Sequence, residues 1–403
     1  MKHNEVGPNE YPLGRCAFEH VRFLVEEIGP RPAGSETEKQ AQAYVLEHLS
    51  GWGYEVQKQP VAFAPLPRFS PIYLIGGLLM ASIPWFIQAY PGLTIWLPAL
   101  LVMVAAYARW VMLRRCCTSQ SANIIAYAHT SPDGPTLILS AHLDSARASA
   151  FRNKFIRYLN YYTIFILQRI AIAVTILSVF KLLDFALPGW LYIIVCVLGS
   201  LAGGWLAFSQ SWNQIAHRNR YSPGAHDNAS GVGVLLALAR YFAVENTQPS
   251  LKLRLGFLFT GAEETGLHGA AEFARQLGVN TATSILSLDM VGAGNVLNYI
   301  TGEGILMPTH TDRELNAYLQ EAYPEIKSLC HTVHSGDFAR FLRAGIPAAA
   351  LQSSGSMEAE IAYHTVFDTL DVIDIPTLDM TAKAILKFIG LKERYLTKET
   401  NRQ

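Results

Sequence analysis

Two adjacent glutamates, Glu263 and Glu264, directly follow a fully apolar segment of the chain. Burying two like charges side by side is costly unless a counter-ion neutralises them. A divalent metal ion supplies that charge, so one carboxylate can bind the metal while the other serves as general base for a metal-bound water. The pair therefore predicts a metal-dependent hydrolytic site.

Further residues of the types that bind metals occur in four other short stretches, each ambiguous by itself. His142 and Asp144 have a spacing that lets a carboxylate orient an imidazole, although an isolated His-x-Asp sequence usually has no function. Asp227 opens a helix, where a carboxylate is also favoured as a simple N-cap. Asp289 ends an apolar strand, and His364 lies close to the last helix.

Taken together, these stretches supply two imidazoles and four carboxylates apart from Asp144, and no cysteine. This donor set suits a pair of zinc ions bridged by a carboxylate better than it suits a cysteine-rich structural zinc site. Two metal ions about 3.5–4 Å apart can lower the pKa of a bridging water and stabilise a tetrahedral oxyanion. The joint pattern predicts a two-zinc hydrolase.

The same stretches resemble the co-catalytic di-zinc exopeptidase family that includes aminopeptidase Y and the bacterial leucyl aminopeptidases. Residues 28–35, 344–347 and 363–371 strengthen the resemblance, which extends over nearly all of the chain outside its apolar regions. Two places depart from the family's pattern. His226 precedes the acidic residue of its motif, and Ser-Gly-Asp-Phe at residues 335–338 replaces a Ser-Asp-His sequence.

The resemblance implies a role for each residue and hydrolysis of a peptide bond near a chain end, most simply by an aminopeptidase. Glu263 would be the base, and Asp144 would support His142. The implied ligands are His142 and Asp289 at one zinc ion, Glu264 and His364 at the other, and Asp227 as the bridge between them.

Apolar residues are concentrated in two regions of the sequence, although half of the whole chain is hydrophobic and only 16% is charged. Residues 70–108 contain no charged side chain, and Pro91 and Gly92 divide them into two segments. Each segment approaches the length needed to cross a hydrocarbon core of about 30 Å. The first region therefore predicts a transmembrane hairpin.

The second apolar region is predicted to form an amphipathic surface helix over residues 151–168 and a second hairpin. Its spans are expected near residues 170–187 and 191–208, with Lys181 and Asp184 paired near the end of the first span. Basic residues flank both hairpins while the turns carry almost no charge. The positive-inside rule then predicts four membrane helices, with both termini and the catalytic domain in the cytoplasm, in a bacterial inner membrane.

Outside these regions, apolar strands alternate with amphipathic helices. This pattern predicts an α/β fold with a mixed, mostly parallel sheet sandwiched by helices, and acidic residues at the carboxyl ends of strands. The predicted peptidase domain comprises residues 1–66, 118–148 and 217–403, and the membrane insertions comprise residues 67–117 and 149–216. The N-terminal residues contain no apolar stretch, so the sequence does not predict a signal peptide. The five cysteines form no spaced framework, which favours reduced thiols over disulfides.

Other classes of function fit the sequence less well. The formal net charge is zero, so no basic field indicates binding to nucleic acid; the expected partners are a peptide substrate and a lipid bilayer. A glutaminyl cyclase resembles the same fold but uses one zinc ion in many members, and a membrane scaffold with an inactive peptidase domain is the non-enzymatic alternative. A transporter is disfavoured because the polar cluster lies outside the apolar spans. Nothing in the sequence indicates an oligomeric state.

Overall fold

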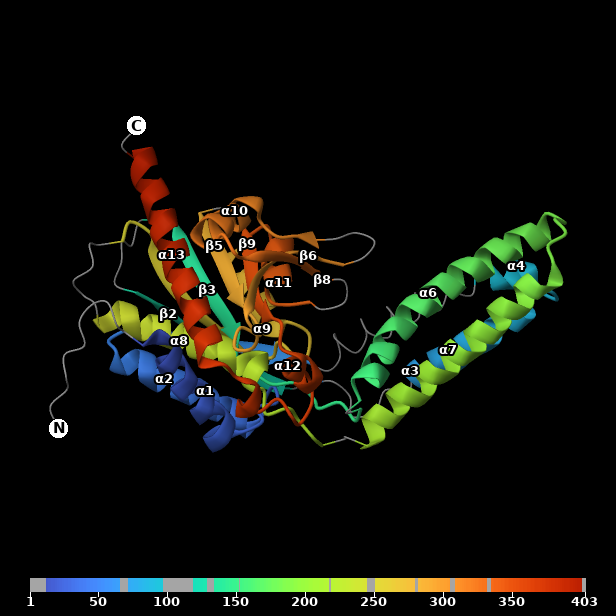
Figure 1. The fold of residues 1–403 in the computed structure, drawn as a ribbon, viewed down its shortest axis with the longest axis horizontal. Coiled ribbons are helices and arrows are strands. Elements are labelled where there is room, and N and C mark those ends of the chain that lie inside the picture. The colour runs from blue at the N-terminus through green and yellow to red at the C-terminus, as the bar shows by residue number, and fades with distance from the viewer. Residues whose placement is uncertain are drawn as a thin grey trace. The chain divides into compact units, whose positions relative to one another are not determined.

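The structure is a computed structural model that describes residues 12–65, 72–96, 119–128, 134–151, 153–216, 219–244, 251–279, 282–304, 309–331 and 335–400. The chain divides into two compact units, drawn as ribbons in Figure 1. We call them the α/β unit, which comprises Met1–Phe63, Thr118–Arg147 and Tyr221–Gln403, and the helical unit, which comprises Ala64–Cys117 and Ala148–Arg220.

A nine-stranded mixed sheet forms the centre of the α/β unit, in the order β1-β2-β4-β3-β5-β9-β6-β7, with β8 also paired to β6. The strands are β1 (Glu55–Phe63), β2 (Ser119–Tyr127), β3 (Thr136–His142), β4 (Arg254–Thr260), β5 (Thr283–Leu288), β6 (Val296–Glu303), β7 (Thr309–His310), β8 (Lys327–His331) and β9 (Ala348–Ser354). The mixed α/β sheet predicted from the sequence is confirmed.

The prediction that the sheet is mostly parallel was wrong outside its centre. Strand β3 pairs parallel with β4 and β5, β5 pairs parallel with β9, and β6 pairs parallel with β8. In contrast, β1 pairs antiparallel with β2, β2 with β4, and β6 with β7 and β9. Antiparallel neighbours need only a hairpin connection. In the sequence, the first apolar region occupies the connection between β1 and β2, so this pairing has no short turn to reveal it.

Helices cover both faces of the sheet and bury a separate apolar cluster on each side. Successive residues of β3 show this division, because Leu137 and Leu139 belong to one cluster and Ile138 to the other. The larger cluster packs under α1 (Leu13–Arg22), α2 (Glu36–Gly51), α8 (Ser230–Val244), α10 (Arg313–Ala322) and α13 (Ile375–Thr400). The smaller cluster packs under α9 (His268–Leu277) and α11 (Phe338–Arg343).

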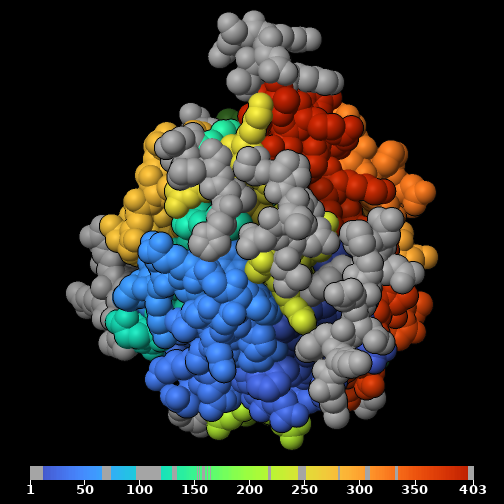
Figure 2. Space-filling model, turned by 90° about the vertical axis from the view of Figure 1, so that its left-hand side faces the viewer, coloured from blue at the N-terminus to red at the C-terminus, as the bar shows by residue number. Residues whose placement is uncertain are grey.

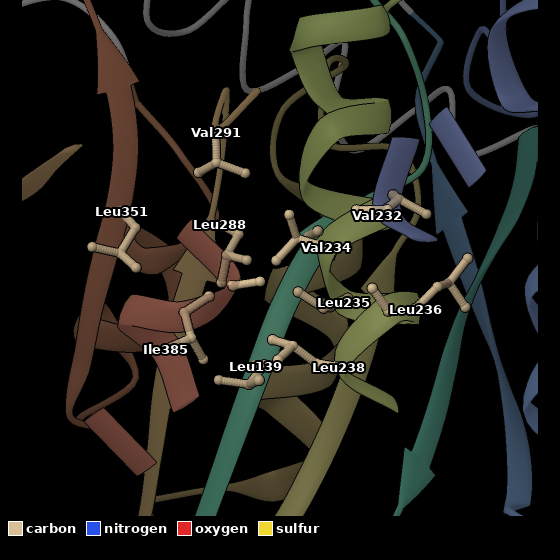
Figure 3. Close-up of a cluster of buried hydrophobic side chains, with 14 of the residues drawn as sticks. Leu139, Val232, Val234, Leu235, Leu236, Leu238, Leu288, Val291, Leu351 and Ile385 are labelled. Atoms are coloured by element: carbon tan, nitrogen blue, oxygen red, sulfur yellow. The ribbon is translucent and has the colours of Figure 1, made fainter. Parts of the chain in front are cut away.

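Helix α8 runs through the larger core and is apolar on nearly all sides, as expected for a helix with little access to water. Figure 3 shows its side chains beside Leu139 of β3, Leu351 of β9 and Ile385 of α13. The first and last helices also lie on the same face of the sheet, since α1 packs against both α8 and α13. Figure 2 shows N-terminal segments in blue and C-terminal residues in red on one face of the molecule.

The helical unit contains two helices whose length and apolar composition are sufficient to cross a membrane: the Phe165–Leu182 part of α6 (Lys154–Leu182) and the 28-residue α7 (Gly189–Ala216). In both, only 28% of the apolar window is buried inside the protein. A core helix of a soluble protein would be mostly buried, so these exposed apolar surfaces differ from those of an ordinary core.

Two details of the predicted hairpins require correction. The amphipathic helix expected at residues 151–168 and the span expected at 170–187 form a single helix, α6, which ends at Leu182. Asp184 follows with a left-handed φ of 53°, a conformation typical of helix ends. The predicted ion pair is absent, since the described side chains of Lys181 and Asp184 lie more than 4 Å apart at their charged atoms.

The first apolar region is described only over residues 72–96. It forms α3 (Ile72–Ser82), the short helical turn η2 (Ile83–Phe86), and α4 (Pro91–Thr94). Most of the second helix predicted there, residues 93–107, lies outside the described residues. Among the described residues, two helices rather than four meet the length of a membrane span.

Helices α3 and α7 pack closely because glycines face each other between them. A Cβ atom on Gly77 would lie 2.5 Å from the carbonyl oxygen of Gly203, and one on Gly203 would lie 2.6 Å from the backbone nitrogen of Ala81. Side chains add hydrogen bonds at the same interface: Trp85 Nε1 donates to Ser200 Oγ at 2.9 Å, and Ser200 Oγ donates to the carbonyl oxygen of Ala81 at 3.0 Å. Small residues that allow close backbone approach are typical of helix packing in membranes.

We expect Gly203→Val to destabilise the helical unit by about 1–3 kcal/mol, because the added carbons meet backbone atoms that cannot move aside. Gly204→Val is the matched control, since a Cβ on Gly204 meets no atom within 4 Å. Thermal unfolding of the purified full-length protein, followed by circular dichroism, should show a lower melting temperature for the first variant alone. Equal effects of both substitutions would contradict this account of the packing.

Candidate metal centre

The carboxyl ends of three neighbouring parallel strands bring together most of the acids and imidazoles singled out in the sequence. His142 is the last residue of β3, Glu263 and Glu264 follow β4 after a two-residue turn, and Asp289 follows β5 directly. Since β4, β3 and β5 lie side by side in this order, their C-terminal residues meet at one edge of the sheet, where such folds place their sites.

Two more residues reach this edge from connecting segments. Asp227 lies in the short helical segment η3 (Ala225–Ala229), immediately before α8. His364 follows α12 (Met357–Ala362) and has a left-handed φ of 52°. All of the predicted ligands thus converge.

Asp227 stands between the two imidazoles. Its Oδ1 atom lies 3.2 Å from Nε2 of His142, and its Oδ2 atom lies 3.0 Å from Nε2 of His364. Each imidazole nitrogen also faces a second carboxylate: Asp289 Oδ1 is 3.6 Å from His142, and Glu264 Oε2 is 3.4 Å from His364. The arrangement forms two three-residue groups that share Asp227, and in each group the donor atoms lie within 4.8 Å of one another.

Two carboxylate oxygens of this cluster have no hydrogen-bond partner within the described part of the protein. In the part of the chain that the structure describes, Glu264 Oε1 and Asp289 Oδ1 are buried without a hydrogen bond. An unsatisfied buried carboxylate oxygen costs free energy unless a cation compensates it. Imidazole nitrogen and carboxylate oxygen are donors that zinc accepts in catalytic sites. The residues present therefore fit bound divalent metal ions.

The charges around the imidazoles are strongly unbalanced. Burial by itself would lower the pKa of His142, but the negative charges of Glu263, Asp227 and Asp289 outweigh burial and raise that pKa well above its usual value. Burial raises the pKa of Asp227, and its contacts with His142 and His364 outweigh burial and lower it. Carboxylates thus exceed cations at this edge of the sheet, which is the electrostatic setting of a metal site.

Asp144, which was predicted to support His142, contacts that imidazole through its backbone rather than through its carboxylate. Its carboxylate does not contact the ring of His142 at hydrogen-bond distance, since Oδ1 lies 3.8 Å from Nδ1. Instead, its backbone carbonyl accepts from His142 Nδ1 at 3.0 Å, which leaves Nε2 as the nitrogen that can bind a metal. The two carboxylate oxygens accept from the backbone N–H groups of Glu263 and Glu264, at 2.9 and 3.0 Å.

Asp368, a buried aspartate with no role predicted from the sequence, holds the segment that carries Asp227. Its Oδ1 atom accepts from the backbone nitrogen of His226 at 2.8 Å, and its Oδ2 atom accepts from that of Asp227 at 3.1 Å. Burial raises the pKa of Asp368 to about 7. The sequence signal for a role of Asp368 was its position in residues 363–371, the stretch that resembles the exopeptidases.

Arg31, also outside the predicted set, joins the two loops that carry His142 and Asp227. Its buried guanidinium donates to the carbonyl oxygens of Leu143 at 3.0 Å, Pro223 at 2.9 Å and Gly224 at 2.9 Å. It also donates to two carbonyls of its own N-terminal segment. One side chain thereby fixes backbone segments that are far apart in the sequence.

The two departures from the family pattern have distinct surroundings. His226 belongs to none of the metal-binding groups among the described residues, and burial lowers its pKa to about 4. Asp337 is buried and accepts from the hydroxyl of Thr260 at 2.5 Å, while its Oδ1 has no hydrogen bond in the described part of the chain. It lines a small cavity together with His142, Asp289 and Gln352.

Comparison with known proteins links this site to a family. Residues 210–389 match the model of peptidase family M28. Over 202 residues, 42% of this chain, the sequence is 28% identical to a protein named probable lipoprotein aminopeptidase LpqL from Mycobacterium tuberculosis. The match spans 39% of that relative's length.

Solved structures from Bacteroides thetaiotaomicron share the fold. A leucine aminopeptidase precursor has a TM-score of 0.55 at 18% identity, with 93% of this chain and 96% of that chain covered. A glutaminyl cyclase bound to N-acetylhistamine has a TM-score of 0.54 at 18% identity, with 93% and 97% covered. The chain is therefore similar to peptidase family M28 over residues 210–389, and its fold is similar to those of these solved structures.

Proposed function

We propose that the chain is a membrane-anchored, zinc-dependent exopeptidase, most simply an aminopeptidase, with two zinc ions in the α/β unit. The observation that carries the proposal is the position of Asp227, whose two carboxylate oxygens face different imidazoles at 3.2 and 3.0 Å. A carboxylate placed in this way can bridge two metal ions, as co-catalytic sites require.

The proposed ligands are the residues of the two groups that share Asp227. His142 and Asp289 would hold one ion, Glu264 and His364 the other, and Asp227 both. Zinc bound there would make an attacking water more acidic and would offset the negative charge that develops on the peptide carbonyl oxygen.

Glu263 is the proposed general base, and its surroundings suit that role. The side chain is buried, with its carboxylate close to His142 and Glu264. Burial, with the negative charges of Glu264 and Asp337, raises the pKa of Glu263 well above its usual value in spite of His142. A carboxylate that holds a proton more readily can take one from the attacking water and return it to the leaving amine.

Glutaminyl cyclase activity is the second candidate, because the fold is similar to a solved cyclase structure as well as to a peptidase. The paired imidazoles on either side of Asp227 favour two metal ions and hence hydrolysis. A catalytically inactive scaffold fits less well, because the proposed base and all five proposed ligands lie together.

The helical unit is the proposed membrane anchor. Helices α6 and α7 are long and apolar enough to cross a bilayer and leave most of their apolar surface exposed. We further propose that the first apolar region supplies the other two of four spans. The flanking basic residues then favour a cytoplasmic α/β unit in a bacterial inner membrane, which we propose acts on peptide substrates.

We expect Glu263→Gln to lower kcat for aminoacyl p-nitroanilides by about 10²–10⁴-fold, the usual contribution of a general base. Zinc content, measured by inductively coupled plasma mass spectrometry, should stay close to that of the wild type, because Glu263 is not a proposed ligand. Activity within a few fold of the wild type would refute the role given to Glu263.

Asp227→Asn should instead lose metal, because the NH2 group of the amide replaces one of the two carboxylate oxygens that face the imidazoles. We expect the zinc content to fall from about two ions per chain to one or fewer, with a corresponding loss of hydrolysis. Glu358→Gln, which changes an exposed acid of α12, is the control. Full zinc content in the Asp227 variant would show that this carboxylate does not bridge.

A substrate panel separates the candidate activities. With zinc bound, we expect release of amino acids from aminoacyl and dipeptide substrates, loss of release after chelation, and recovery on adding zinc. Cyclisation of N-terminal glutamine without hydrolysis, together with one zinc per chain, would favour the cyclase. Neither activity in a zinc-loaded protein would favour the scaffold.

A further inference from the structure

The turn that carries Glu263 is held by side chains from other parts of the fold. Four consecutive backbone N–H groups, from residue 261 to residue 264, each donate to a side-chain oxygen of another segment. The pairs are Gly261 to Asn123 Oδ1 at 3.1 Å, Ala262 to Glu38 Oε1 at 3.2 Å, Glu263 to Asp144 Oδ1 at 2.9 Å, and Glu264 to Asp144 Oδ2 at 3.0 Å.

This dependence follows from the shape of the turn. The chain leaves β4 at Thr260, and Ala262 adopts a left-handed φ of 55°, a conformation that costs a residue with a Cβ free energy. Crowding is severe at Gly261, where a Cβ would lie 2.8 Å from the carbonyl oxygen of Ala122 and 3.0 Å from Glu38 Oε1. The surrounding side chains therefore determine where Glu263 lies.

Glu38 supplies one of these side chains from the first turn of α2, far away in the sequence. Part of its role is to cap α2: its backbone nitrogen donates to Oγ of the N-cap residue Ser35 at 3.1 Å, and its Oε2 accepts from the backbone nitrogen of Gly34, the residue before the N-cap, at 2.6 Å. A capping glutamate can do this at the surface. Glu38 is fully buried, so the cap alone does not account for its position.

The other carboxylate oxygen of Glu38 points toward the site. Oε1 accepts from Ser121 Oγ at 2.6 Å and from the backbone nitrogen of Ala262 at 3.2 Å. Ala262 is itself fully buried and precedes the proposed base by one residue. One carboxylate therefore joins the start of α2 to the turn on which Glu263 is carried.

We propose that Glu38 is a positioning residue for Glu263, acting through the backbone N–H of Ala262; this inference rests on the proposed role of Glu263 as the base. Loss of the acceptor leaves the buried N–H of Ala262 without a partner. The turn then relaxes, and the carboxylate of Glu263 moves away from its position beside His142 and Glu264. Small displacements of a catalytic group reduce turnover strongly.

The test compares Glu38→Ala with Glu38→Gln in the purified full-length protein. The amide oxygen of glutamine can replace Oε1 as acceptor for Ala262, leaving the amide nitrogen to face the half-exposed Gly34, where the cap is weakened. We expect Glu38→Ala to lower kcat roughly ten- to a hundredfold with little change in KM or zinc content. Glu38→Gln should keep kcat within about threefold of the wild type and lose mainly thermal stability.

Two controls separate positioning from general damage. Glu36→Ala removes an exposed acid in the same turn of α2 that pairs with Lys39, and it should change nothing. Ser121→Ala removes the other hydrogen bond to Oε1 and should lower stability without lowering kcat. Glu38→Ala with wild-type kcat, or Glu38→Gln as impaired in kcat as Glu38→Ala, would overturn the proposal.

A readout independent of catalysis distinguishes failure of this proposal from failure of the proposed function. Amide hydrogen exchange, followed by mass spectrometry, should show faster exchange in the peptide covering residues 261–264 for Glu38→Ala but not for Glu36→Ala. If the wild type has no hydrolytic activity, the proposed function fails whatever the exchange pattern. If the wild type is active and exchange in this peptide is unchanged in Glu38→Ala, the link from Glu38 to the turn is absent.

Discussion

Negative charge concentrated around two imidazoles is the constraint on which this site depends, and the protein compensates it in two ways. Some acids have both oxygens satisfied by backbone N–H groups, as in Asp144 and Asp368. Others keep one buried oxygen without a hydrogen bond in the described part of the chain, as in Glu264 and Asp289. Acids of the first kind fix the backbone, whereas those of the second kind are left for cations. In these four acids, the hydrogen bonding of the carboxylate distinguishes the two that fix the backbone from the two that are proposed to bind metal.

The proposed base and ligands could be singled out in the sequence because their signal is local. His142 ends an apolar strand, Glu263 and Asp289 follow apolar strands, and parallel strands place such residues at one edge of the sheet. Glu38, Arg31 and Asp368 could not be assigned roles in this way, because their importance lies in contacts with segments far away in the sequence. The resemblance to the exopeptidases did include Arg31 and Asp368, in the stretches of residues 28–35 and 363–371.

The fold shows the same division between local and long-range information. The alternation of strands and helices predicted a mixed α/β sheet, and the parallel centre agrees with it. The antiparallel edges were missed because β1 and β2 are separated in the sequence by an apolar region. Likewise, apolar composition located α6 and α7, but the end of α6 at Leu182 depends on local backbone geometry near Asp184 rather than on hydropathy.

The position of the second segment of the helical unit, Ala148–Arg220, accounts for the burial of Arg31 in spite of the free energy needed to bury its charge. The chain leaves the α/β unit just after the segment that carries His142 and Asp144, and it returns just before the one that carries Asp227. Arg31 binds carbonyl oxygens on both sides of this break, and Ser222 donates its backbone N–H to Ala146 at 2.9 Å. Burial lowers the pKa of Arg31 to about 10, while nearby aspartates oppose that shift, so its charge also offsets part of the acidic cluster. A buried cation that binds the backbone on both sides of the insertion can hold His142 and Asp227 close together, even though a long helical insertion separates them in the sequence.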